Sequence, residues 1–309
     1  MSEPSTPGRT AWYSGLDPGK SGKWMGILFW ATLVGVALLL LISGYNAFTG
    51  ANRVNLHYAF LGGLAGFGAT ALGAVVAVVL RDISARTQDI MLGFAAGMML
   101  AASSFSLILP GIEAAQSICD NKLLSACVVV LGLGLGAALM IGLERFVPHE
   151  HAQSGRKGPQ AQRFNRVWLF VLAITLHNLP EGMAIGVSFA NGDMKVGLPL
   201  TTAIAIQDIP EGLAVALALR VTGIGALRAA LIAVASGLME PLGAVVGLGI
   251  STSFALGYPV ALGLAAGAMI FVVSHEVIPE THRNGHETPA TLGLMLGFGV
   301  MMFLDTALG

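Results

Sequence analysis

Two segments of six residues each carry the side chains best suited to chemistry. Both follow the pattern polar, polar, apolar, Pro, Glu, Gly, and they read His177-Asn178-Leu179-Pro180-Glu181-Gly182 and Gln207-Asp208-Ile209-Pro210-Glu211-Gly212. Positions i and i+4 of a helix share one face, so the first segment stacks His177 on Glu181. The second segment stacks Gln207 on Glu211 in the same way. Imidazole and carboxylate ligands together suit Zn²⁺, Cd²⁺, Fe²⁺ or Mn²⁺ better than Mg²⁺ or Ca²⁺.

The second residue of each segment supplies a further ligand. Asn178 and Asp208 lie about 100° around the helix from the first face. If the two helices pack together, their stacked residues form one metal site and their second residues form another beside it. Glu181 and Glu211 are then placed to bridge, since one carboxylate can bind two metal ions about 3.5–4 Å apart. We therefore expect two adjacent sites for a divalent transition metal.

The composition indicates that these segments lie in a membrane. The chain has 309 residues, a mean hydropathy of +0.76 and 11% charged residues, against roughly 25% in a soluble domain. A membrane helix needs about 20 mostly apolar residues. We predict an all-α polytopic membrane protein with about nine spans, at 24–45, 58–80, 90–112, 123–144, 167–190, 197–219, 229–250, 258–280 and 290–308. Residues 1–23, rich in Pro, Ser and Gly, are expected to form a disordered tail.

The distribution of basic residues predicts the orientation. Only Arg53, Lys122 and Lys195 of the sixteen Lys and Arg residues fall in one set of alternate loops. The positive-inside rule therefore places the N-terminus and the loop 145–166 in the cytoplasm, and the C-terminus on the opposite side. The sequence has no GxxxxGK[ST] motif and no basic-aromatic surface, so neither a nucleotide nor a nucleic acid is an expected partner.

Buried carboxylates without a basic neighbour are the main electrostatic feature. Glu181, Asp208, Glu211 and Glu240 fall within predicted spans, whereas Lys and Arg lie at span ends. Even one central Asp costs about 2.5–3.5 kcal/mol. The four acids must therefore be protonated, hydrated or neutralised by bound cations, and two divalent ions supply four positive charges.

The prolines and the duplication point to transport. Pro180 and Pro210 each leave a backbone carbonyl without its helical partner, which is tolerated at membrane depth only beside protein, water or a ligand. Successive spans run in opposite directions. Matching motifs in them predict an inverted pseudo-two-fold pair around a midplane site, as in transporters.

Other candidates have two interpretations each. Glu240 is a further metal ligand or a hydrogen-bonded structural acid, and Met99 is a thioether ligand or a core residue. Asp305 is most simply a solvated helix end. His149, His151, His282 and His286 lie in loops, where histidines are usually solvated. A transport path toward the cytoplasm would use His275, Glu276, His149 and His151.

The paired motifs resemble the fourth and fifth core helices of the ZIP (Zrt-/Irt-like protein) family, in its GufA-like bacterial branch. The resemblance covers residues 58–309 as an eight-helix core and leaves 24–45 as an extra N-terminal helix. It implies a zinc or iron importer in the bacterial inner membrane, with an elevator-like motion and often a homodimer. Many eukaryotic relatives have His where this chain has Gln207, which suggests tolerance for cadmium.

Two other functions compete with a metal carrier. An intramembrane metalloenzyme would need His-Glu-x-x-His or paired Glu-x-x-His motifs, and the sequence has neither. A metal channel could use the same ligands to line a pore. Tight ligation at the midplane favours a carrier, because conduction requires weak binding.

Overall fold

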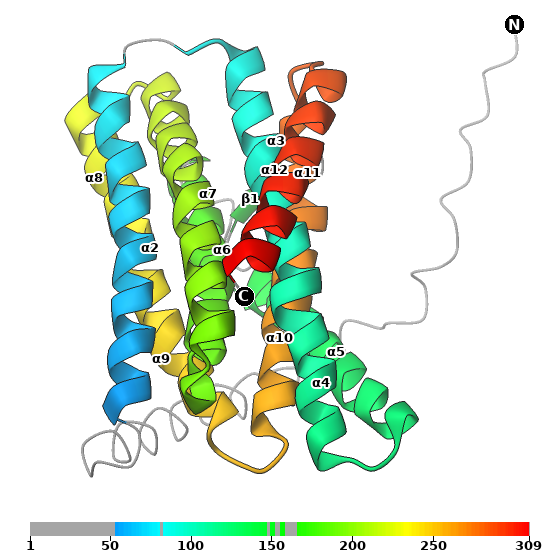
Figure 1. The fold of residues 1–309 in the computed structure, drawn as a ribbon. Helices are drawn as coiled ribbons and strands as arrows, with labels where there is room; N and C mark the ends of the chain where they lie inside the picture. Colours follow the sequence, from blue (N-terminus) through cyan, green and yellow to red (C-terminus); the bar gives the residue numbers. More distant parts are fainter. Residues whose placement is uncertain (1–52, 81–82, 147–148, 152–154, 158–165, 309) are drawn as a thin grey trace, which may run out of the picture. The chain divides into compact units, whose positions relative to one another are not determined.

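The computed structural model describes residues 53–80, 83–146, 149–151, 155–157 and 166–308. The predicted tail 1–23 and the predicted span 24–45 lie outside these residues. The described part belongs to one unit, Leu39–Gly309, and is almost entirely helical (Figure 1). This confirms the all-α membrane architecture.

The long helices match the predicted spans. In order they are α2 (Arg53–Val79), α3 (Ala85–Ala101), α4 (Leu109–Ile118), α5 (Lys122–Phe146), α6 (Arg166–Ser188), α7 (Met194–Val221), α8 (Ala226–Ser236), α9 (Met239–Ser251), α10 (Gly257–Val272) and α12 (Glu287–Leu308). Shorter elements are η2 (Ala102–Ile108), η4 (Ala190–Gly192), η5 (Val273–Val277), α11 (Ile278–Thr281) and the strands β1 (His149–His151) and β2 (Gly155–Lys157). Among the described residues, seven helical stretches are long and apolar enough to cross a membrane, and α6 is a further helix of 23 residues.

Three predicted spans have internal irregularities that the sequence did not locate. The π-helices η2 and η5 interrupt the third and eighth spans, each followed by a proline, Pro110 or Pro279. The span predicted at 229–250 consists of α8 and α9, which places Glu240 in the first turn of α9. Part of the loop 145–166 forms an antiparallel hairpin, in which His149 pairs with Lys157.

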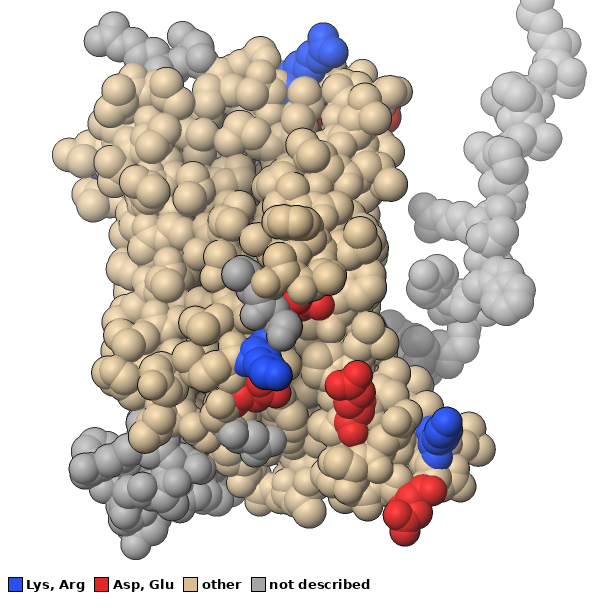
Figure 2. Space-filling view, in the orientation of Figure 1, with Lys and Arg blue, Asp and Glu red and all other residues tan. Residues whose placement is uncertain are grey.

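The helices form two groups by their packing. In one group α2 packs against α7, α8 and α9, and α6 packs against α9. In the other, α3 packs against α12 and α5 packs against α10 (Figure 1). We call these the signature bundle and the flanking bundle. Figure 2 shows a surface with few charged side chains, as expected for helices that face lipid.

Glycines allow the close packing inside each bundle. A Cβ on Gly186 of α6 would collide with the Ala244 carbonyl of α9, and one on Gly73 of α2 with the Ile209 carbonyl of α7. In the flanking bundle, a Cβ on Gly97 would likewise collide with a backbone carbonyl of α12, and a Cβ on Gly136 with one of α10. Small residues let membrane helices approach closely, which explains much of the glycine content of 41 residues.

Candidate metal centre

The paired segments lie on two helices that run through their prolines. Helix α6 contains Pro180, and α7 contains Pro210 as well as Pro199, without a break at any of them. The glycine that ends each segment brings a neighbouring backbone close. A Cβ on Gly182 would collide with Glu240, and one on Gly212 with the Thr70 carbonyl. The motif glycines thus pack α6 against α9 and α7 against α2.

The structure brings the carboxylates of both segments together. One carboxylate oxygen from each of three residues lies within 4.8 Å of the other two; the residues are Glu181, Asp208 and Glu211. Glu181 and Asp208 are each 1% exposed, and Glu240 is fully buried beside them. In the described part of the chain, the ion pair that involves Arg or Lys is the exposed Arg283–Glu280 contact of 3.1 Å. No described Lys or Arg side chain therefore pairs with these acids, whereas His177 interacts electrostatically with Glu211.

Hydrogen bonds fix part of the cluster and leave donor atoms for a cation. The Gln207 amide nitrogen donates to Glu181 Oε1 at 2.7 Å, and the Thr70 hydroxyl donates to Glu240 Oε1 at 2.8 Å. Gln207 Oε1, Asp208 Oδ2 and Glu240 Oε2 are buried without a hydrogen-bond partner. These are three of the five such side-chain atoms among the described residues. Buried polar atoms normally have partners, so their concentration here indicates a place for a ligand.

The remaining predicted ligands differ in their surroundings. Asn178 is buried, at 3% exposed, on the helix that carries Glu181. His177 Nε2 lies 2.7 Å from Glu276 Oε2, and so joins α6 to η5 of the flanking bundle. Met99 is buried on α3 in a hydrophobic cluster with Met98, which matches its interpretation as a core residue.

The predicted path residues are described in part. Glu276 and His275 lie in η5, and the His275 ring packs on Phe271 at a centroid distance of 5.1 Å. The backbones of His149 and His151 lie in β1, but their side chains are outside the described set.

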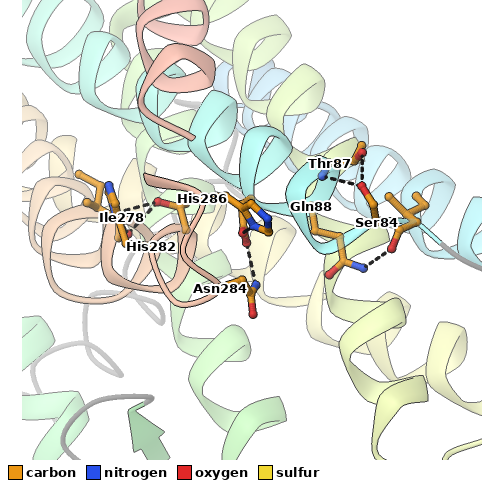
Figure 3. Close-up of polar contacts among 10 residues, drawn as sticks. Ser84, Thr87, Gln88, Ile278, His282, Asn284 and His286 are labelled. Carbon is orange, nitrogen blue, oxygen red and sulfur yellow. Dashed lines mark hydrogen bonds and ion pairs between the residues drawn. The ribbon is translucent and has the colours of Figure 1, made fainter. Parts of the chain in front are cut away.

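Three polar residues interpreted as solvated also have partners. Asp305 is half-buried and accepts a hydrogen bond of 2.6 Å from Ser106. His286 Nδ1 lies 2.8 Å from Asp89 Oδ2, and His282 Nδ1 lies 2.8 Å from the Ile278 carbonyl (Figure 3). His282 and His286 are half-buried, so each is partly solvated and also has a partner: His286 contacts Asp89 near the start of α3, and His282 contacts the backbone of its own segment.

Sequence reasoning missed two residues that touch the centre. Thr70 and Gly66 lie on α2, which carries neither paired segment. Neither residue is charged, and no repeat marks their positions, so only the packing of α2 against α7 and α9 brings them to attention.

Comparisons with known proteins agree with the motifs. The family model described as ZIP Zinc transporter matches residues 147–305. The chain is 66% identical to zinc transporter ZIPB of Bordetella bronchiseptica, over 90% of each chain. It is 44% identical to zinc transporter GufA of Myxococcus xanthus, over 78% of this chain and 95% of the relative. It is also 32% identical to zinc transporter ZIP11 of Homo sapiens, over 81% of this chain and 97% of the relative.

Proposed function

Because the chain belongs to the ZIP family of zinc transporters, as its paired motifs predict, we propose that it carries Zn²⁺ toward the cytoplasm through a site for two ions. The observation that carries this proposal is the cluster of carboxylates, which has no described Lys or Arg partner. Two of its oxygens, on Asp208 and Glu240, and the amide oxygen of Gln207 are buried and accept no hydrogen bond from a described donor. Four such acids are costly at membrane depth unless protons or cations neutralise them. Metal is therefore cargo here, and no catalytic cofactor or enzymatic activity is proposed.

The ligands divide into two sets that share two carboxylates. The first position uses His177 and Gln207 with Glu181 and Glu211. The second position uses Asn178, Asp208 and Glu240 with the same two glutamates. This division follows from the helical faces and from the shared cluster of Glu181, Asp208 and Glu211 oxygens. Met99 would add a thioether ligand to the first position if α3 lines it.

The contact between His177 and Glu276 suggests the direction of release. Glu276 lies on the flanking bundle toward the end of its span that the positive-inside rule assigns to the cytoplasm. A carboxylate 2.7 Å from a metal-binding imidazole is placed to accept the ion next. We propose that the ion passes from His177 to Glu276, with His275, His149 and His151 farther along the path.

The packing supports an elevator-like motion of the signature bundle. Most described glycines whose added Cβ would collide with another helix's backbone do so within one bundle, as Gly186 does with Ala244. The exception is Gly257, which meets the end of α9 where the chain passes from α9 to α10. Backbone-to-backbone packing of this kind resists sliding, because it interlocks the two helices. The contact of α3 with α7, which joins the two bundles, lacks it and is better suited to sliding. A homodimer in the bacterial inner membrane, held by the flanking bundle, would provide a fixed scaffold for the motion.

Uptake of Zn²⁺ by proteoliposomes tests the site. We expect Glu211→Ala and His177→Ala each to abolish uptake while the protein still folds. Glu287→Ala, the same change at an exposed acid on α12, should leave uptake unchanged. Normal uptake in both site variants would refute the assignment.

A metal channel is the second candidate, since the same ligands could line a pore. Flux that saturates with Zn²⁺ concentration supports the carrier, whereas flux that rises linearly supports the channel. Competition by Cd²⁺, Fe²⁺ and Mn²⁺ in this assay would define the metal selectivity. The neutral Gln207 predicts that several divalent metals are accepted. Repeating the assay with and without a proton gradient tests proton coupling.

A further inference from the structure

Helix α2 forms a third wall of the metal centre. The Thr70 side chain, 6% exposed, donates a hydrogen bond of 2.8 Å to Glu240 Oε1. Gly66 lies one turn earlier on the same face of α2. The wall therefore presents one hydroxyl and one position without a side chain to the carboxylates of α7 and α9.

The two partnerless carboxylate oxygens meet above Gly66. A Cβ at this position would collide with Glu240 Oε2 and would lie 3.1 Å from Asp208 Oδ2. Both oxygens are buried without hydrogen-bond partners. The Asp208 and Glu240 carboxyl groups lie within hydrogen-bonding reach of each other, so a proton shared between them, or a cation bound by both, removes their mutual repulsion. The missing side chain of Gly66 leaves room for Glu240 Oε2, which occupies the place that a Cβ would take.

Thr70 determines which oxygen of Glu240 faces this point. The terminal torsion of a glutamate is broad, so an unrestrained carboxylate rotates freely. The hydroxyl of Thr70 holds Oε1 and so leaves Oε2 for Asp208 and the ion. Thr70 is itself held firmly, because its carbonyl packs against Gly212 and its methyl group against Gly237.

We propose that Thr70 is a positioning residue that orients Glu240 toward the second metal ion, and that Gly66 leaves the space that Glu240 Oε2 needs to face that ion. This inference rests on the proposed two-ion site and assigns part of the metal affinity of its second position to α2. Hydrogen-bond partners of metal-binding carboxylates orient them, and losing one typically costs about 10–100-fold in metal affinity. Thr70→Val removes the hydroxyl at nearly constant volume. It should therefore lower the affinity for one of the two ions by at least about tenfold.

The experiment is a Zn²⁺ titration of the purified full chain in detergent, which gives the number of bound ions and the affinity of each. Wild-type protein should bind two ions. Thr70→Val should lower the affinity for one of them, and Thr70→Ser should restore that affinity. Gly66→Ala should abolish binding of the same ion. Thr201→Val is the matched control, since this threonine is buried and its hydroxyl has no hydrogen-bond partner. It should leave both affinities unchanged.

Glu240→Gln separates failure of this inference from failure of the proposed function. Suppose that Glu240→Gln lowers the affinity for one ion, but that Thr70→Val and Gly66→Ala bind both ions with wild-type affinity. The role of α2 is then refuted, and the two-ion site stands. If wild-type protein binds one ion, the two-ion site itself is refuted. Should Thr70→Val not fold, Thr70→Ala is titrated instead. Wild-type affinities in that variant, or failure of Thr70→Ser to restore binding, also refute the positioning role.

Discussion

The turn before α12 allows a sharp comparison of a buried and an exposed polar contact. Asp89, at the start of α3, is 1% exposed and is bound by His286 at 2.8 Å and by Asn284 at 3.0 Å (Figure 3). On the same turn, Arg283 contacts Glu280 at 3.1 Å with both side chains largely exposed. These contacts differ mainly in burial, so mutation should separate the two effects.

We predict that His286→Ala lowers the free energy of unfolding by about 1.5–2 kcal/mol. A hydrogen bond to a charged group contributes about 1.5–3 kcal/mol, and the lower part of this range applies because Asn284 still binds Asp89. Arg283→Ala should cost less than about 1 kcal/mol, since exposed ion pairs contribute little. In a thermal melt of the detergent-purified chain, His286→Ala should lower the midpoint by roughly 3–6 °C and Arg283→Ala by no more than about 2 °C.

Added salt gives a second measure of the same difference. The exposed Arg283 contact is screened by salt, whereas the buried contact at Asp89 is screened much less. The destabilisation by His286→Ala should therefore persist at high ionic strength. Equal effects of the two variants, or loss of the His286 effect in salt, would show that the Asp89 contact does not fasten α3 to α12.

Two further predictions concern packing and protons. Gly186→Ala should strongly reduce the yield of folded protein, because its Cβ collides with the Ala244 carbonyl, whereas Gly134→Ala, with open space around it, should be neutral or stabilising in the same melt. Zn²⁺ affinity should fall as the pH is lowered from neutral, because protons compete with metal for the site carboxylates; equal titrations at neutral and mildly acidic pH would contradict competition.

The sequence predicted the long helices well because each needs only length and apolar composition. It did not predict the break between α8 and α9, since Gly237 and Leu238 fit equally well inside a continuous span. Nor did it predict η2 and η5. A π-helix depends on which carbonyl each amide reaches, and this is decided by packing against neighbouring helices.

The site was predictable to the extent that it is local. Spacing within one helix places His177 over Glu181, and duplication identifies the partner helix. Contacts that join distant segments leave no such pattern. Thr70 and Gly66 occur in an apolar run, and Asp89 falls just before the predicted span 90–112, where an acid is expected at the surface. Their roles depend on tertiary packing alone.

In the proposed two-ion site, Gln207 would serve the centre both with and without metal. Its amide nitrogen donates to Glu181 Oε1, which partly compensates for the burial of that carboxylate, while its amide oxygen has no partner. A histidine at this position would offer one ring nitrogen to the metal and could use the other only as a donor directed elsewhere. The amide instead presents a donor and an acceptor at the same end of the side chain. It can therefore bind the ion through oxygen while it continues to orient Glu181, at the expense of the tighter zinc selectivity that an imidazole gives.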